Sequence, residues 1–133
     1  MMVTKRVLII DDEADVRAVL RGCLEDIAGW EVITAPSGSE GLRLVIADPP
    51  DAILLDVMMP HMDGLTFIKL LRTHPQGTSI PVVLLTAKTS LTSANFSSDP
   101  DFKLDVKGVI PKPFDPFLLI EQFAHLLDWD VEL

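Results

Sequence analysis

Residues 7–12 read Val7-Leu8-Ile9-Ile10-Asp11-Asp12, four aliphatic residues that run into two aspartates. An unbroken apolar run of this length is typical of a strand buried on both faces, as in parallel sheets. A second run of the same kind, Ala52-Ile53-Leu54-Leu55, ends in Asp56. The two stretches therefore predict buried strands that each carry carboxylates at the carboxyl end.

On either side of these runs, apolar strands and amphipathic stretches alternate along the chain. We expect strands at 7–10, 30–35, 52–55, 82–85 and 109–110. Helical spacing indicates helices over about 16–27, from a capping box at 37–40 to the prolines at 49–50, over 64–74, and from Asp115-Pro116 to about Leu127. Such alternation predicts an α/β fold, a (βα)5 doubly wound parallel sheet with helices on both faces.

One segment departs from this alternation. Residues 89–107, where a fourth helix is expected, are rich in serine, threonine, asparagine and aspartate, which favour turns and caps. We therefore expect an atypical fourth-helix region, irregular and used for partner contact. No repeat or second domain is evident, and residues 1–133 are expected to form a single domain without an effector domain.

Composition excludes several classes of protein. The chain has 133 residues, 48% of them hydrophobic, which is enough for one core, and a formal net charge of −9. A chain this acidic repels nucleic-acid phosphates and anionic lipids. We therefore expect neither nucleic acid nor membrane as a direct partner. Cys23 is the single cysteine, expected to be a buried structural thiol. The run 7–10 is too short for a signal peptide and no stretch would span a membrane, so we expect a cytoplasmic protein.

Polar residues follow the predicted strands where each strand ends. Asp11 and Asp12 follow the first strand, Asp56 the third, Thr86 the fourth, and Lys112 the fifth after one proline. Ligands of open parallel sheets bind outside the carboxyl ends of the strands. The fold hypothesis therefore brings these five residues into one cleft.

The residue types in this cleft suit phosphoryl transfer. Three neighbouring carboxylates repel one another by about 4 kcal/mol per close pair at an effective dielectric constant of 20, and a hard divalent cation removes that conflict. Mg²⁺ uses few carboxylates and shares phosphate oxygens. An aspartate can attack phosphorus to form an acyl phosphate, and the Lys112 ammonium and the Thr86 hydroxyl can stabilise the incoming group.

Four motifs carry a resemblance to a known family. Residues 7–13 resemble the first strand and acidic pair of response-regulator receiver domains, and residues 56–64, Asp-Val-Met-Met-Pro-His-Met-Asp-Gly, resemble their phosphoacceptor loop. Leu84-Leu85-Thr86-Ala87 is similar to their threonine strand and Lys112-Pro113-Phe114 to their lysine turn. The resemblance spans roughly residues 5–127 and implies a flavodoxin-like sheet with strand order 2-1-3-4-5.

The resemblance also implies a role for each matching residue. Asp56 would accept phosphate from a sensor histidine kinase or a phosphotransfer protein, with Thr86 sensing and Lys112 pairing with the phosphoryl group. Mg²⁺ would be held by Asp11, Asp12, Asp56 and the backbone carbonyl of Met58. The Lys112–Pro113 peptide would be cis. The domain would be no enzyme beyond slow self-dephosphorylation, and its phosphorylation would switch contacts with a downstream protein that the sequence does not identify.

Two other functions stay open at this point. The aromatic residue that the family usually has three positions before its lysine is replaced by Val109, which favours a phosphorylation-independent pseudo-receiver that acts as an interaction module. A phosphatase of the haloacid-dehalogenase class also uses an aspartate nucleophile with a threonine and a lysine. That class has a second aspartate two residues after the nucleophile, where this chain has Met58.

Overall fold

The strands form one parallel sheet. The computed structural model describes residues 4–87 and 106–130. All four strand pairings are parallel, in the order β2-β1-β3-β4-β5, as predicted. The strands are β1 (Arg6–Ile10), β2 (Glu31–Ala35), β3 (Ala52–Asp56), β4 (Val82–Thr86) and β5 (Gly108–Pro111). Strand order reverses at β1, which lies between β2 and β3, and this is where such sheets bind ligands.

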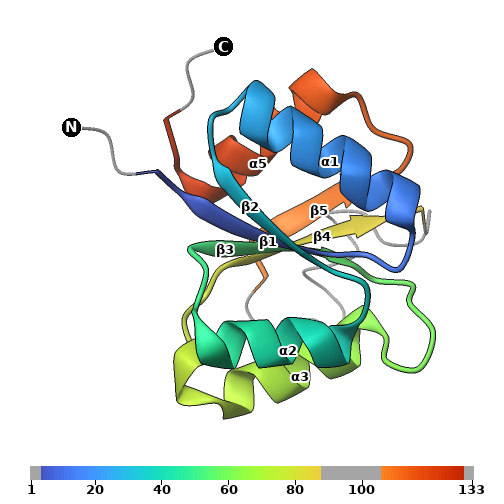
Figure 1. Cartoon of the computed structure of the whole chain (residues 1–133), viewed down its shortest axis with the longest axis vertical. Helices are drawn as coiled ribbons and strands as arrows, with labels where there is room; N and C mark the ends of the chain where they lie inside the picture. The colour runs from blue at the N-terminus through green and yellow to red at the C-terminus, as the bar shows by residue number, and fades with distance from the viewer. Residues whose placement is uncertain (1–3, 88–105, 131–133) are drawn as a thin grey trace.

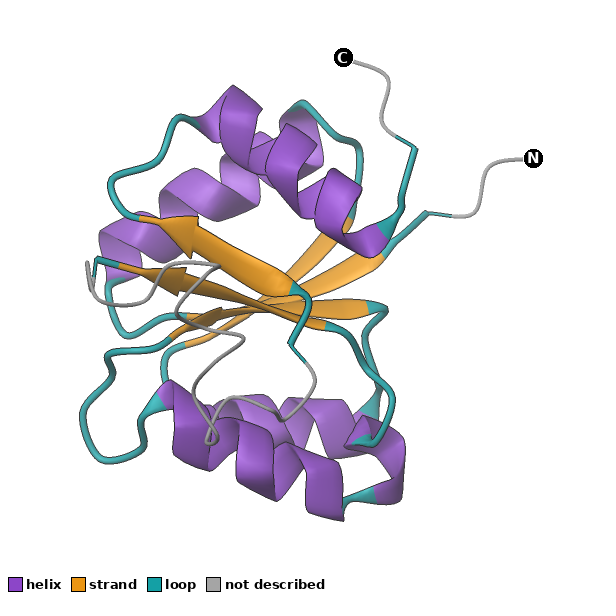
Figure 2. Ribbon diagram, turned by 180° about the vertical axis from the view of Figure 1, so that it is seen from behind, coloured by secondary structure: helices purple, strands orange, loops and turns teal. Residues whose placement is uncertain are grey.

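Helices cover both faces of the sheet. Figure 1 shows α1 and α5 on one face and α2 and α3 on the other, and Figure 2 shows the same three layers from behind. The helices are α1 (Ala14–Asp26), α2 (Gly38–Ala47), α3 (Gly64–Thr73) and α5 (Pro116–Leu127), with a short 3-10 turn η1 (Pro75–Gly77) after α3. The expected irregular segment at 89–107 lies outside the described residues except for its last two positions, so that expectation stays a prediction.

Each strand contributes to two cores because its side chains alternate between the faces. Val7 and Ile9 pack with residues of α1 and α5, including Phe123. Leu8 and Ile10 pack with residues of α2 and α3 on the other face. The pattern of continuous apolar strands is explained by this burial on both sides.

Helix starts follow the predicted caps. The Ser37 hydroxyl accepts a hydrogen bond from the Glu40 amide (3.2 Å) at the start of α2. Asp115 Oδ1 accepts from the amides of residues 117 and 118 (2.9 and 3.2 Å), with Pro116 as the first residue of α5. Neither aspartate of the Asp11-Asp12 pair is the N-cap of α1, because that position is Glu13 and no side chain caps it.

Two apolar helix residues, whose helical spacing predicts an inward position, are nearly half exposed. Val19 of α1 is 49% exposed and Ile46 of α2 is 42% exposed. The apolar stripe of each helix is wider than its contact with the sheet, so one edge of the stripe stays outside. Cys23 is partly rather than fully buried, and burial raises the pKa of its thiol.

The two tryptophans pack together at the amino-terminal edge of the sheet. Trp30, Phe123 and Trp129, here called the aromatic cluster, have ring centroids 5.2–5.8 Å apart, and two of the three pairs are edge-to-face. The Lys5 ammonium lies 5.2 Å from the centroid of the Trp129 ring. Both tryptophans are therefore packing residues. In the described part of the chain, every helix is too short or too polar to cross a lipid bilayer.

Candidate functional site

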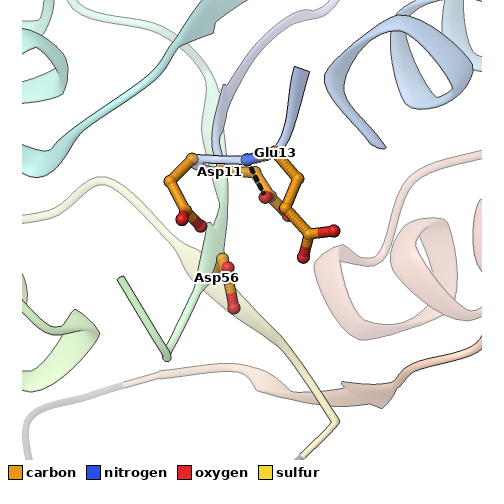
Figure 3. A group of neighbouring side chains, drawn as sticks. Asp11, Glu13 and Asp56 are labelled. Carbon is orange, nitrogen blue, oxygen red and sulfur yellow. Dashed lines mark hydrogen bonds between the residues drawn. The ribbon is translucent and has the colours of Figure 1, made fainter. Parts of the chain in front are cut away.

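Four carboxyl groups meet at the carboxyl edge of the sheet. Asp11, Asp12, Glu13 and Asp56 each offer a carboxylate oxygen, and these atoms all lie within 4.8 Å of one another. We call these four residues the acidic cluster. Figure 3 shows how the side chains of Asp11, Glu13 and Asp56 approach one another from the ends of β1 and β3. The tertiary structure therefore unites residues that are 45 positions apart in the sequence.

The turn after β1 holds the first part of the cluster in place. Asp11 is fully buried, and its amide donates to the Ala35 carbonyl of β2 (3.2 Å). Its Oδ1 accepts from the Glu13 amide (2.9 Å), the bond drawn in Figure 3. Arg17 of α1 reaches back and donates from Nη1 to the Asp11 carbonyl (2.7 Å). The side chain of Asp11 is thus fixed, whereas Asp12 and Glu13 are exposed.

Asp56 is the last residue of β3 and is only 4% exposed. Burial and the nearby charge of Asp11, with a smaller contribution from Asp12, raise its pKa from 3.8 to about 6. The Met58 amide, which donates to Asp56 Oδ1 (3.1 Å), and the charge of Lys112 oppose this shift. At neutral pH the side chain is therefore a poorly solvated carboxylate that gains from any added cation.

Lys112 follows β5 and turns back into the acidic cluster. Its Nζ lies 3.0 Å from Asp11 Oδ2, 3.4 Å from Glu13 Oε1 and 3.6 Å from Asp56 Oδ2. Burial lowers the pKa of Lys112, but the hydrogen bond to Asp11 and the charges of Asp56 and Glu13 outweigh it and raise the pKa overall. The ammonium is consequently charged and is shared among three carboxylates.

Thr86 closes the site on the side of β4. It is the last residue of that strand and is 2% exposed. Its backbone carbonyl accepts from the Lys112 amide (2.8 Å), which ties the lysine turn to the end of β4. The Lys112–Pro113 peptide is cis, as the resemblance implied. All the strand-end residues singled out in the sequence therefore lie at one edge of the sheet.

Two residues at this edge had no role in the sequence interpretation. Glu13 joins the cluster and contacts Lys112, and Arg17 anchors the turn that carries Asp11. The position of Glu13 directly after two aspartates was a usable signal. Arg17 gave none, because a helix arginine that bonds a backbone carbonyl of the preceding turn resembles any surface arginine.

The cluster has the properties of a site for a hard divalent cation. Carboxylates about 4 Å apart repel by about 4 kcal/mol per pair at an effective dielectric constant of 20. Among the described residues, Lys112 is the side-chain cation that lies within 4 Å of carboxylates of the cluster, and one ammonium does not balance four carboxylates. Oxygen ligands of this kind and spacing suit Mg²⁺.

Comparisons with known proteins agree with this geometry. The family profile of the response regulator receiver domain matches residues 7–124. Response regulator MprA of Mycolicibacterium vanbaalenii is 38% identical over 122 residues, which cover 92% of this chain and 50% of that protein. Sensor histidine kinase TmoS of Ectopseudomonas mendocina is 35% identical over 92% of this chain and 11% of its own length. The chain thus spans at most about half the length of these two relatives.

Solved structures share the fold at similar identity. The chemotaxis response regulator CheY4 of Vibrio cholerae superposes with a TM-score of 0.82 and 32% identity, over 93% of this chain and 99% of that one. The signal receiver domain of a signal transduction histidine kinase from Syntrophus aciditrophicus gives a TM-score of 0.76 and 28% identity, over 94% and 91% of the two chains.

Receiver domains are signalling domains of two-component phosphorelays rather than classical enzymes, receive phosphate from histidine kinases, and bind Mg²⁺ at an acidic cluster like the one found here. The profile match covers most of the chain, and the 38% identity to MprA extends over 92% of it. This protein therefore belongs to the response-regulator receiver domain family.

Proposed function

We propose that Asp56 is the phosphoacceptor of this receiver domain, and that the phosphoryl group comes from the phosphohistidine of a sensor histidine kinase or a phosphotransfer protein. One observation carries the proposal: the Lys112 ammonium lies 3.6 Å from a buried Asp56 carboxylate at the edge where three other carboxyl groups meet. A nucleophile, its counter-charge and a cation site thus adjoin one another, as phosphoryl transfer requires.

The proposed Mg²⁺ ligands are Asp11, Asp12, Asp56 and the backbone carbonyl of Met58. The short spacing of the carboxylates and the raised pKa of Asp56 support the first three. The Met58 backbone is next to the site, because its amide donates to Asp56. When bound, the ion would neutralise phosphate oxygens and the excess negative charge of the cluster.

In the proposed transfer, a carboxylate oxygen of Asp56 attacks the phosphorus of the donor. A P–O bond forms, the P–N bond to the imidazole breaks, and the nitrogen leaves with the electron pair. With a pKa of about 6 in the metal-free protein, Asp56 is ionised at neutral pH, and a bound Mg²⁺ would favour this ionised form further. Lys112 pairs with the phosphoryl oxygens, and Thr86 offers its hydroxyl to them.

An apolar cavity beside the site supports a protein as the donor. It has a volume of about 510 Å³ and lies between α1 and the start of α5, with Lys112 in its wall. Val16, Val19, Phe114 and Pro116 contribute apolar surface, and Glu13 and Asp15 give it an acidic rim. Apolar surface of this kind, next to the acceptor, suits a docking side chain of a macromolecule better than a small donor.

We propose that residues 1–133 act as one receiver domain whose phosphorylation changes its contacts with a downstream protein. The position that the family usually fills with an aromatic residue is Val109 of β5, which is partly buried. A β-branched side chain moves less volume than an aromatic ring when it changes rotamer. Phosphorylation would therefore change the protein surface near this position less than in the family as a whole. The presence of Val109 is the observation that favours a phosphorylation-independent interaction module as the second candidate.

One experiment separates these functions. The protein is incubated with a small acyl-phosphate donor and Mg²⁺, and its intact mass is measured. A single added phosphoryl group that is absent in Asp56→Asn supports the proposal. Asp51→Asn is the matched control, because Asp51 precedes the same strand at its opposite end and binds the Arg6 amide. It should be phosphorylated like the wild type.

The other outcomes identify the alternatives. No adduct on the wild type would refute the proposal in favour of the interaction module. Rapid turnover of many phosphomonoesters, without a lasting adduct, would favour a phosphatase.

A further inference from the structure

The loop that follows Asp56 rests on the start of a neighbouring helix. Gly38 is the first residue of α2 and is buried. A Cβ atom placed on Gly38 would lie 2.5 Å from Sδ and 3.2 Å from Cγ of Met62. Because real Cβ contacts are longer than this, the Met62 side chain occupies the space that any residue larger than glycine would need. Gly38 and Met62 therefore form a close, residue-specific contact between α2 and the loop 57–63.

The loop is also held near its two ends and by Met59, which is buried in the core on the α2–α3 face of the sheet. The Gly64 amide donates to the Val57 carbonyl (2.9 Å), which brings the ends of the loop together. Asp63 caps α3 by accepting from the Thr66 amide (2.8 Å). At the tip, His61 has a positive φ of 69°, and the Met62 amide bonds only two residues back, to Pro60. Among these interactions, the packing of Met62 on Gly38 is what joins the tip to the rest of the fold.

The same loop carries the group that touches the acceptor. The Met58 amide donates to Asp56 Oδ1 (3.1 Å), and the next residue, Met59, is buried. Met59 belongs to the same apolar core that Met62 packs against. A tip that leaves α2 therefore loosens the packing of Met59 and displaces its neighbour Met58. We infer that Met62 is a positioning residue: packed on Gly38, it holds the loop so that the Met58 amide stays on Asp56. Its effect on phosphoryl transfer rests on the proposed function above.

Gly38→Ala is a clean way to disturb this contact. Alanine favours a helix over glycine, so the substitution does not weaken α2 itself. The atom it meets is near the end of a flexible side chain, and Met62 can move away without rupture of the core. We therefore expect a melting temperature close to that of the wild type together with a displaced loop.

The first measurement needs no phosphate. Amide exchange at Met58 and Gly64 is followed by NMR in the wild type, Gly38→Ala, Met62→Ala and the double variant. Each single variant should exchange roughly tenfold faster at these amides, because local opening becomes easier when a partly buried methionine loses its packing. The double variant should exchange no faster than Met62→Ala, since the added methyl group then meets empty space. Met62→Leu, which refills the space, should restore slow exchange.

The second measurement is the initial rate of phosphorylation by a small acyl phosphate with Mg²⁺. Both single variants should be several-fold slower than the wild type, and the double variant no slower than Met62→Ala. Val45→Ala is the control for general destabilisation, because Val45 is fully buried in the same helix and the same core. It should lower the melting temperature but leave the exchange at Met58 and the rate unchanged.

Three results would overturn the inference. The first is exchange at Met58 and Gly64 that stays at the wild-type rate in both single variants. The second is a double variant whose effects multiply, and the third is a Val45→Ala variant that opens the loop equally. If the wild type takes up no phosphate while the exchange pattern holds, the proposed function fails and the positioning of the loop by Met62 stands.

Discussion

Replacing Asp56 by asparagine is expected to stabilise the metal-free protein at neutral pH. Burial and the charges of Asp11 and Asp12 raise the pKa of Asp56 from 3.8 to about 6 in the folded state. One unit corresponds to about 1.4 kcal/mol, so ionised Asp56 costs the folded state about 3 kcal/mol relative to the unfolded chain. The pKa of about 6 already includes the opposing charge of Lys112, so asparagine, which carries no charge, should stabilise the folded state by about 3 kcal/mol.

The sign of this effect depends on pH in a defined way. The folded-state pKa is raised, so the stability that Asp56 contributes is fully present below its unfolded pKa of 3.8. It is lost as pH rises through the folded pKa of about 6. The wild type and Asp56→Asn should therefore be nearly equal in stability at about pH 4 and differ fully only above about pH 6.5.

The assay is urea unfolding of both proteins in EDTA, at about pH 4, pH 5.5 and pH 7.5. Mg²⁺ should reverse the order at neutral pH, because a ligand at about 1,000 times its Kd adds about 4.1 kcal/mol to the protein that binds it. Asp51→Asn serves as the charge-matched control and should show no such gap. A wild type as stable as Asp56→Asn in EDTA at neutral pH, or a gap equal at all three pH values, would refute the electrostatic reasoning.

Three further substitutions probe other parts of the structure. Lys112→Met removes the ammonium from the acidic cluster and should lower the free energy of unfolding in EDTA by about 2 to 3 kcal/mol, measured by urea titration. Mg²⁺ should recover most of this loss. An unchanged urea midpoint in EDTA would contradict the pairing of Lys112 with the carboxylates. Trp129→Ala removes two edge-to-face contacts of the aromatic cluster and should cost about 2 kcal/mol, seen as a lower thermal midpoint. Gly41→Ala places a Cβ 2.5 Å from Cδ1 of Ile10 and should cost about 1 to 3 kcal/mol by overpacking, whereas a neutral effect in calorimetry would show that the core yields at this point.

Much of the fold was predictable because its signals are local. Four of the five strands are apolar runs, and helical spacing marked each described helix. The structure confirms the caps at Ser37 and Asp115. Such caps can be predicted because the capping side chain bonds an amide only two to three residues further along the chain. The exposure of Val19 and Ile46 was not predictable, since it depends on where a neighbouring element ends its contact rather than on the helix itself.

The site followed from one topological rule rather than from any single motif. Carboxyl ends of parallel strands meet at one edge, which is enough to group the aspartates with Thr86 and Lys112 from the sequence alone. The rule says nothing about distances, so it did not predict that Lys112 is shared with Glu13 or that Arg17 anchors the turn. It was also silent on Met62, whose contact with Gly38 joins two segments without any common sequence pattern.

The sequence by itself determined which elements form, how the strands are ordered through the family resemblance, and which residues stand at the strand ends. These properties depend on residue type and on spacing within short segments. Only the tertiary structure decided the charge balance at the edge of the sheet, because it sets how deeply Asp56 is buried and how far its carboxylate lies from Lys112. These two quantities contribute to the raised pKa of Asp56, about 6. The physical reason is that desolvation and Coulomb energy depend on distances between segments remote in the chain, and packing alone sets those distances.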